Sequence, residues 1–137
     1  MITWAGRILA ILGGAHAVGA TLLGYRHFDQ WFTFGLWFPD SEITELPAPI
    51  GGFWLGPGSF GVPLLLVGLL VTWMDRRAIT PPAFLAWTLI GWTAGCALIF
   101  EPAPWVLATA AAVQLLMGIR RAGNSIPQRR AAAAAAR

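Results

Sequence analysis

Four long apolar runs divide this chain, and they constrain its fold more than any other feature. They cover residues 2–24, 52–74, 83–100 and 104–119. An α-helix rises about 1.5 Å per residue, so about 20 apolar residues cross the roughly 30 Å hydrocarbon core of a bilayer. The sequence therefore predicts an all-α integral membrane protein, built as a bundle of four transmembrane helices.

The composition supports this prediction. The chain of 137 residues is 57% hydrophobic and 11% charged, with a mean hydropathy of +0.65. Soluble domains carry about 25% charged residues, so most side chains are expected to face lipid or other helices. The single cysteine, Cys96, excludes an intramolecular disulfide and a cysteine-rich metal site. The net charge of +3 comes from arginines beside the apolar runs, so no nucleic-acid partner is expected.

The arginines predict how the helices are oriented. With four spans, Arg7, Arg76, Arg77 and every arginine from Arg120 onward lie on one side, and Arg26 lies on the other. Arginine-rich loops remain cytoplasmic. Both termini are therefore predicted in the cytoplasm of a multi-pass protein of the cell membrane.

One domain is expected at this length. Residues 1–122 form the predicted transmembrane domain, and the Arg- and Ala-rich residues 123–137 are predicted to be a disordered cytoplasmic tail. The short turn at 101–104 makes the third and fourth helices antiparallel neighbours. Gly56-Pro57-Gly58 and Pro63 predict a kinked or partly unwound start to the second helix.

The segment from Tyr25 to Phe60 concentrates aromatic and acidic side chains. It holds ten of the 17 aromatic residues and four of the six acids. Such a segment suggests a lid or wall over a cavity that opens within the bilayer. The plainer interpretation is an interfacial loop, because tryptophan and tyrosine gather at membrane surfaces. For residues 25–52 the sequence leaves both a re-entrant lid and a surface loop open.

Three acids are candidate catalytic residues: Glu101, Asp40 and Glu42. Glu101 lies between the third and fourth runs, and burial there would raise its pKa and keep it protonated near neutral pH. Alternatively, it is an exposed acid stabilised by the N-terminal end of the fourth helix. The alternative for Asp40 and Glu42 is a solvated loop in which Ser41 or Asp40 caps a short helix.

His16 is a candidate substrate-binding residue, because an ionisable group in the middle of a membrane helix is costly. Alternatively, its imidazole is hydrogen-bonded to a neighbouring helix. His27 is eleven residues further on, about 16 Å along a helix, so no metal site is expected. Aromatic residues complete the candidate substrate-binding set, with membrane anchoring as their alternative role. They are Trp31, Trp37, Phe38, Trp54, Trp92 and Trp105.

Three sequence motifs carry a resemblance to a known family. They are Gly-Gly-Ala-His at 13–16, GGFWLGPGSFGVPLLLVGLL at 51–70, and the Pro-x-Pro-Trp turn at 102–105. Through them, residues 2–120 resemble a family of small bacterial four-helix membrane proteins whose function is unknown. The resemblance implies the same four-span plan and a location in the bacterial inner membrane.

In size, number of spans and content of aromatic and acidic residues, the chain also resembles the small membrane-bound terpene cyclases of bacterial indole-alkaloid and drimentine-type pathways. This resemblance implies protonation-initiated cyclisation of an isoprenoid, and no catalytic residue of that family is carried over. An acid kept protonated in an apolar cavity can start such a reaction. Aromatic faces then stabilise the carbocation, by about 2 kcal/mol or more each when desolvated.

Two functions are therefore predicted from different classes. The first is a membrane terpene cyclase that needs no metal, nucleotide or redox cofactor. The second is a noncatalytic membrane protein that binds a lipid or quinone, or acts as a structural accessory subunit. Both imply a lipophilic small molecule or lipid as partner, and both are compatible with a homo-oligomer.

Overall fold

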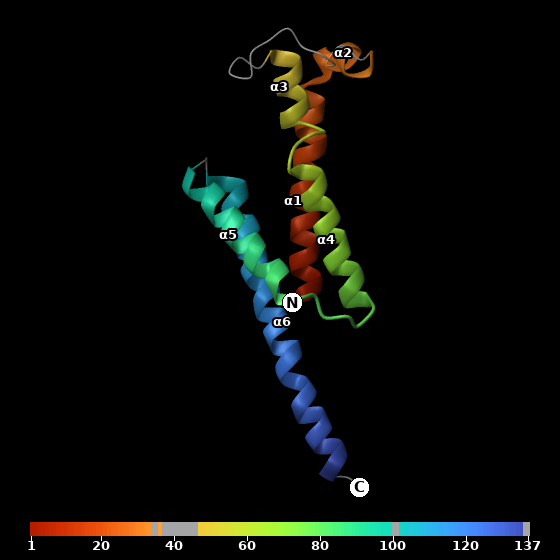
Figure 1. Cartoon of the computed structure of the whole chain (residues 1–137), viewed down its shortest axis with the longest axis vertical. Helices are drawn as coiled ribbons and strands as arrows, with labels where there is room; N and C mark the ends of the chain where they lie inside the picture. Colours follow the sequence, from red (N-terminus) through yellow and green to blue (C-terminus); the bar gives the residue numbers. More distant parts are fainter. Residues whose placement is uncertain (34–35, 37–46, 100–101, 136–137) are drawn as a thin grey trace. The chain divides into compact units, whose positions relative to one another are not determined.

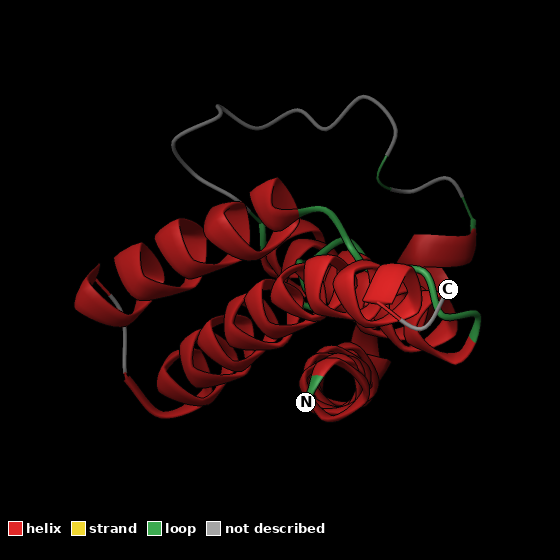
Figure 2. Cartoon of the chain, turned by 90° about the horizontal axis from the view of Figure 1, so that it is seen from below, coloured by secondary structure: helices red, strands yellow, loops and turns green. Residues whose placement is uncertain are grey.

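The computed structural model describes the whole chain except residues 34–35, 37–46, 100–101 and 136–137. Throughout the described part, every regular element is a helix (Figures 1 and 2), so the predicted all-α class is confirmed. The α-helices are α1 Ile2–Leu23, α2 Phe28–Phe32, α3 Ala48–Leu55, α4 Gly61–Arg76, α5 Ala83–Ile99 and α6 Pro102–Ala135, and a 3-10 helix, η1 Tyr25–His27, precedes α2.

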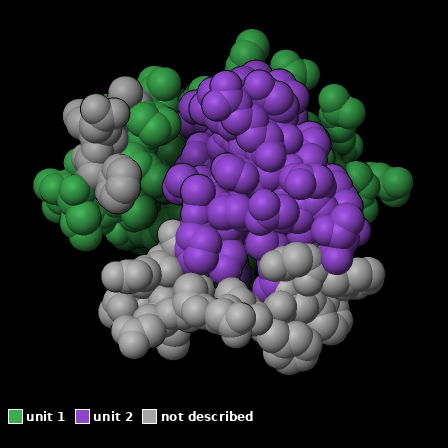
Figure 3. Space-filling model, turned by 90° about the horizontal axis from the view of Figure 1, so that it is seen from above, with its two compact units in different colours: residues 1–9, 67–137 green, residues 10–66 purple. Residues whose placement is uncertain are grey.

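The chain divides into two compact units, coloured separately in Figure 3. Unit 1 contains Met1–Leu9 and Val67–Arg137, and unit 2 contains Ala10–Leu66. Helices α1 and α4 each contribute residues to both units. The units are described one at a time.

In unit 1, α5 and α6 form an antiparallel hairpin, as their short connection predicted. The Thr109 hydroxyl lies 2.9 Å from the Thr93 hydroxyl, and the Trp92 and Trp105 rings meet edge to face with centroids 5.5 Å apart. The first turns of α1 pack on α4, where a methyl group at Gly6 would lie 2.8 Å from the Gly68 carbonyl oxygen. The buried core includes Ala5, Leu9, Val71, Ala86, Leu89, Ala108, Ala111, Ala112 and Leu115.

In unit 2, α1 and the first turn of α4 approach each other backbone to backbone. A methyl group at Gly61 would lie 2.8 Å from the Ala17 nitrogen and 2.9 Å from the Gly13 oxygen, and one at Gly13 would lie 2.6 Å from the Gly61 oxygen. Contact this close requires glycine at both positions. Small residues serve the same purpose where helices pack in membranes.

Length and composition mark α1, with 22 residues, as the helix of the described part that can clearly cross a membrane. α5 is also apolar but has 17 residues. The second apolar run is not one continuous helix, because residues 56–60 separate α3 from α4. The predicted interruption near Gly56-Pro57-Gly58 is therefore observed.

The last helix is longer than the fourth apolar run. α6 continues from Pro102 through Ile119, where the predicted span ends, to Ala135. The disorder expected for residues 123–137 stays a prediction.

Candidate functional site

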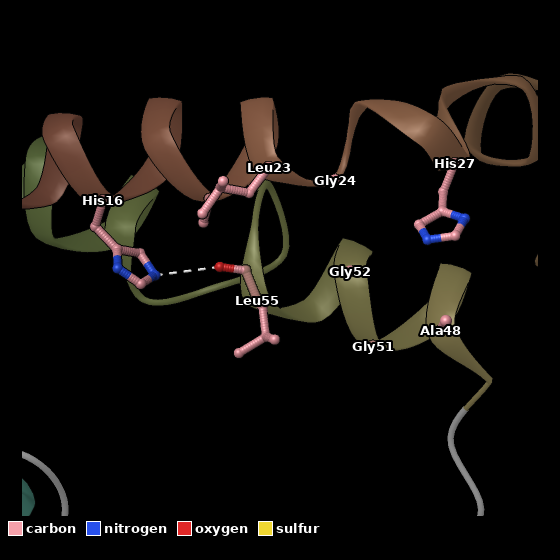
Figure 4. A pocket seen from close by; sticks show the side chains of 9 residues that line it. His16, Leu23, Gly24, His27, Ala48, Gly51, Gly52 and Leu55 are labelled. Atoms are coloured by element: carbon pink, nitrogen blue, oxygen red, sulfur yellow. Dashed lines mark hydrogen bonds between the residues drawn. The ribbon is translucent and has the colours of Figure 1, made fainter.

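An open groove of about 500 Å³ lies in unit 2 between the C-terminal part of α1 and α3 (Figure 4). Its walls are mostly apolar, and two imidazoles supply its polar side chains. The lining residues are His16, Ala20, Leu23, Gly24, His27, Ala48, Gly51, Gly52 and Leu55. Pockets that bind small molecules have volumes of about 300–1,000 Å³ and combine apolar walls with a few polar groups. This groove has both properties.

His16 is fixed by contacts on both sides of the α3–α4 interruption. Its Nε2 atom lies 3.1 Å from the carbonyl oxygen of Leu55. Because a carbonyl oxygen only accepts, Nε2 must carry the proton and donate it. The ring also stacks on Phe60, with centroids 4.2 Å apart. The structure therefore contains the interhelical hydrogen bond that was one of the two interpretations of His16.

His27 lies at the other end of the groove, at the last position of η1 (Figure 4). Its side chain is half-buried. Its ring nitrogens make no hydrogen bond to the part of the protein that the structure describes, whereas His16 is already bonded to Leu55. Of the two imidazoles, His27 is therefore the one with no hydrogen-bond partner at either ring nitrogen among the described residues.

Trp31 forms a second layer behind two glycines of the groove. Its Nε1 donates a hydrogen bond to the Pro49 carbonyl oxygen at 2.8 Å. A methyl group at Gly24 would lie 2.6 Å from the Trp31 ring, and one at Gly52 would lie 3.3 Å from it. The ring therefore fills the space that these glycines leave, and it joins the end of α1 to α3.

Further aromatic rings surround Trp31. Phe28 lies at a centroid distance of 5.0 Å, and Phe53 meets Trp31 edge to face at 6.0 Å. Trp54 contacts Phe53 at 6.0 Å but is 59% exposed and does not line the groove. Of the two predicted aromatic residues of unit 2 that the structure describes, Trp31 is thus closer to the candidate site than Trp54.

The remaining predicted residues lie either in unit 1 or outside the described residues. Trp92 and Trp105 belong to unit 1, where they pack on each other. The candidate acids Glu101, Asp40 and Glu42, together with Trp37 and Phe38, lie outside the described residues. Among the residues that are described, no three His, Cys, Asp or Glu side chains gather into a metal-binding cluster.

The sequence contains a signal for the groove in the spacing of its small residues. Ala20 on α1 and Gly24 directly after its end are four residues apart, as are Ala48 and Gly52 on α3. Residues at this spacing share one face of a helix. Two small faces that meet leave space between their helices, and the two histidines mark the ends of that space.

A second open groove, of about 610 Å³, lies between α5 and α6 in unit 1. Gln114 and Thr109 are its polar lining residues, and the Thr109 hydroxyl is already engaged with Thr93 and with the Trp105 carbonyl oxygen. Neither of these side chains is ionisable, whereas both polar side chains of the His16–His27 groove are imidazoles. We therefore treat the groove in unit 2 as the principal candidate site.

Fold and site together define a class: an all-helical protein with an apolar groove flanked by two imidazoles. No protein-family model, curated protein or solved structure matches this chain. The groove and the chemistry of the side chains around it are therefore the basis for a functional proposal.

Proposed function

We propose that this chain is a four-span membrane protein, with both termini in the bacterial cytoplasm, that binds a small hydrophobic ligand in the His16–His27 groove. The apolar character of α1 and α5 supports the membrane location. So do large apolar side chains that are almost fully exposed, such as Leu23 at 86% and Leu98 at 88%. Exposed apolar surface of this kind is typical of contact with a membrane or a partner.

The observation that carries the binding proposal is the pairing of apolar walls with an imidazole that has no protein partner in the described residues. A ligand with an apolar body can lie along Ala20, Gly51 and Gly52. A carbonyl or hydroxyl group on that ligand can hydrogen-bond to His27. Quinones and isoprenoid alcohols have this combination of groups, so they are the proposed ligand class.

Gly51 provides a direct test. It lines the groove, and a methyl group added there would meet nothing within 4 Å. Gly51→Leu should therefore fill the groove without a steric clash, and leucine favours the helix over glycine by about 0.8–1 kcal/mol. We expect at least a tenfold loss of affinity for a short-chain ubiquinone analogue, measured by equilibrium dialysis of the protein in neutral detergent.

The matched control is Gly19→Leu on α1, because Gly19 also has open space but does not line the groove. It should bind the analogue as the unmodified protein does. His27→Leu should weaken binding by removing the polar contact. Unchanged affinity in a folded Gly51→Leu variant, or no binding of any quinone or isoprenoid alcohol by the unmodified protein, would refute this function.

A second candidate function is the terpene cyclase, and the cluster of Phe28, Trp31 and Phe53 beside the groove favours it. Such aromatic faces would stabilise a carbocation formed nearby. Glu101, Asp40 or Glu42 would be the proton donor, and the reaction requires no cofactor.

The cyclase proposal is tested by incubating purified protein with linear isoprenoid substrates and analysing the products. We expect the Glu101→Gln/Asp40→Asn double variant to lose product formation and to remain monodisperse in detergent. The single variant Glu42→Gln tests whether the third acid contributes to product formation. Full turnover by the double variant would exclude Glu101 and Asp40, and no turnover by the unmodified protein would leave ligand binding as the function.

A further inference from the structure

Three arginines of unit 1 each lie over the face of an exposed tryptophan. The guanidinium carbon is 5.2 Å from the ring centroid for Arg7 and Trp4, 5.7 Å for Arg77 and Trp73, and 5.6 Å for Arg120 and Trp87. The tryptophans are 60%, 50% and 53% exposed, in the same order. A cation within about 6 Å of a tryptophan ring is attracted by its π-system. Each pair therefore holds a positive charge against the apolar face of an exposed ring.

Helix packing brings the three pairs to the same end of unit 1. The Thr3 hydroxyl of α1 donates a hydrogen bond to Asp75 near the end of α4. A methyl group at Gly118 of α6 would lie 2.7 Å from the Ile2 side chain. The start of α1, the end of α4 and the middle of α6 are therefore at one level. The third pair adds the start of α5 to this end of the unit. Trp87 of α5 lies beneath Arg120, which follows Gly118 by two residues on α6.

The charge at this end is strongly positive. Arg76 and Arg121 are exposed and adjoin the paired arginines Arg77 and Arg120. Asp75 is the single acid among the described residues of unit 1, and its carboxylate already accepts the hydrogen bond from Thr3. An anionic partner is therefore complementary to this surface.

The surroundings of the pairs identify what kind of anion fits. Leu69 and Leu70 precede Trp73 and are 52% and 50% exposed, and Phe84 precedes Trp87 and is 69% exposed. Exposed apolar side chains next to arginines suit a molecule with a charged head and an apolar tail. Guanidinium groups bind phosphate through two parallel hydrogen bonds, and tryptophans are enriched at the headgroup level of membranes.

We infer that these three pairs, here called the Arg–Trp belt, bind the phosphate headgroups of anionic phospholipids on the cytoplasmic face of the membrane. The inference rests on the proposed membrane location and is independent of the ligand in the His16–His27 groove. The tryptophan rings hold the guanidinium groups at the headgroup level while the neighbouring leucines and Phe84 contact the acyl chains.

The test uses the full chain in neutral detergent, with the thermal unfolding midpoint followed while one compound is added. The additions are phosphatidylglycerol, phosphatidylcholine and inorganic phosphate. We expect phosphatidylglycerol alone to raise the midpoint. Each basic side chain near an anionic membrane contributes about fivefold to binding. The Arg7→Gln/Arg77→Gln/Arg120→Gln variant should therefore need at least tenfold more phosphatidylglycerol for half of the effect.

Arg26→Gln is the matched control, because Arg26 also lies over an aromatic ring, Tyr25 at 5.9 Å, but belongs to unit 2. Its response to phosphatidylglycerol should equal that of the unmodified protein. The inference is overturned if the triple variant stays within twofold of the unmodified protein, if Arg26→Gln loses as much, or if inorganic phosphate stabilises equally well.

Should the triple variant fail to fold, its three single variants decide the question, because each arginine is exposed. All three within twofold of the unmodified protein would overturn the belt. The quinone-analogue affinity is measured in parallel. A normal response to phosphatidylglycerol with no analogue binding refutes only the groove, and the reverse result refutes only the belt.

Discussion

The imidazole of His16 donates a hydrogen bond from Nε2 to the carbonyl oxygen of Leu55, 3.1 Å away. Leu55 is the last residue of α3, and the carbonyl groups in the last turn of a helix have no partner within that helix. A polar side chain in the middle of an apolar helix thus satisfies a carbonyl group where the second apolar run is interrupted. The same contact fixes one end of the candidate groove.

His16→Phe should therefore destabilise unit 2. Phenylalanine retains a ring to stack on Phe60 but cannot donate a hydrogen bond to Leu55. A hydrogen bond of this kind contributes about 0.5–1.5 kcal/mol to stability, so the thermal unfolding midpoint in detergent should fall. His16→Gln keeps a donor and should lose less. Equal midpoints for His16→Phe and the unmodified protein would mean that the bond contributes nothing.

Gly61→Ala should be more damaging, because the added methyl group would lie 2.8 Å from the Ala17 nitrogen, which is backbone and cannot rotate away. Overpacking of this kind costs about 1–3 kcal/mol. Gly91→Ala is the control, since a methyl group there meets nothing within 4 Å and alanine favours the helix. The two variants should therefore shift the unfolding midpoint in opposite directions. A neutral Gly61→Ala variant would contradict the close approach of α1 and α4.

Helix positions were largely predictable from sequence because apolar runs and proline–glycine breaks act locally. α5 begins at Ala83, directly after Pro81-Pro82, and the break at Gly56-Pro57-Gly58 separates α3 from α4. Only α1 among the described helices has both the length and the composition of a clear membrane span. The four-span arrangement therefore remains a proposal.

The groove was not predictable from sequence, because it depends on which faces of α1 and α3 meet. The sequence suggests a role for His27 only as a possible metal ligand. In the structure it lies opposite Gly52 and lines the groove. The pairing of Trp87 with Arg120 likewise depends on the antiparallel register of α5 and α6. Contacts between distant segments follow from side-chain packing, which the periodicity of one segment does not specify.

Trp31→Phe should loosen the attachment of α3 to the end of α1. The variant keeps an aromatic ring near Gly24 and Gly52 but removes the Nε1 donor to the Pro49 carbonyl oxygen. We expect a loss of about 1 kcal/mol in stability and a weaker affinity of the groove for the quinone analogue. Trp54→Phe, at an exposed position that makes no groove contact, should change neither quantity. A Trp31→Phe variant with unchanged affinity would show that this wall does not shape the groove.

Membrane topology can be measured with reporter fusions after Met74, Phe100 and Arg121. Arg7, Arg76 and Arg77 adjoin the ends of apolar segments on the predicted cytoplasmic side, and arginines near such ends are retained in the cytoplasm. We therefore expect cytoplasmic signals from the first and last fusions and an external signal from the fusion after Phe100. α5 has 17 residues, about 26 Å at the helical rise, which is just sufficient to cross a thin bilayer or one locally compressed around the protein. A cytoplasmic signal at Phe100 would mean that the α5–α6 hairpin does not cross the membrane, and it would overturn the four-span arrangement.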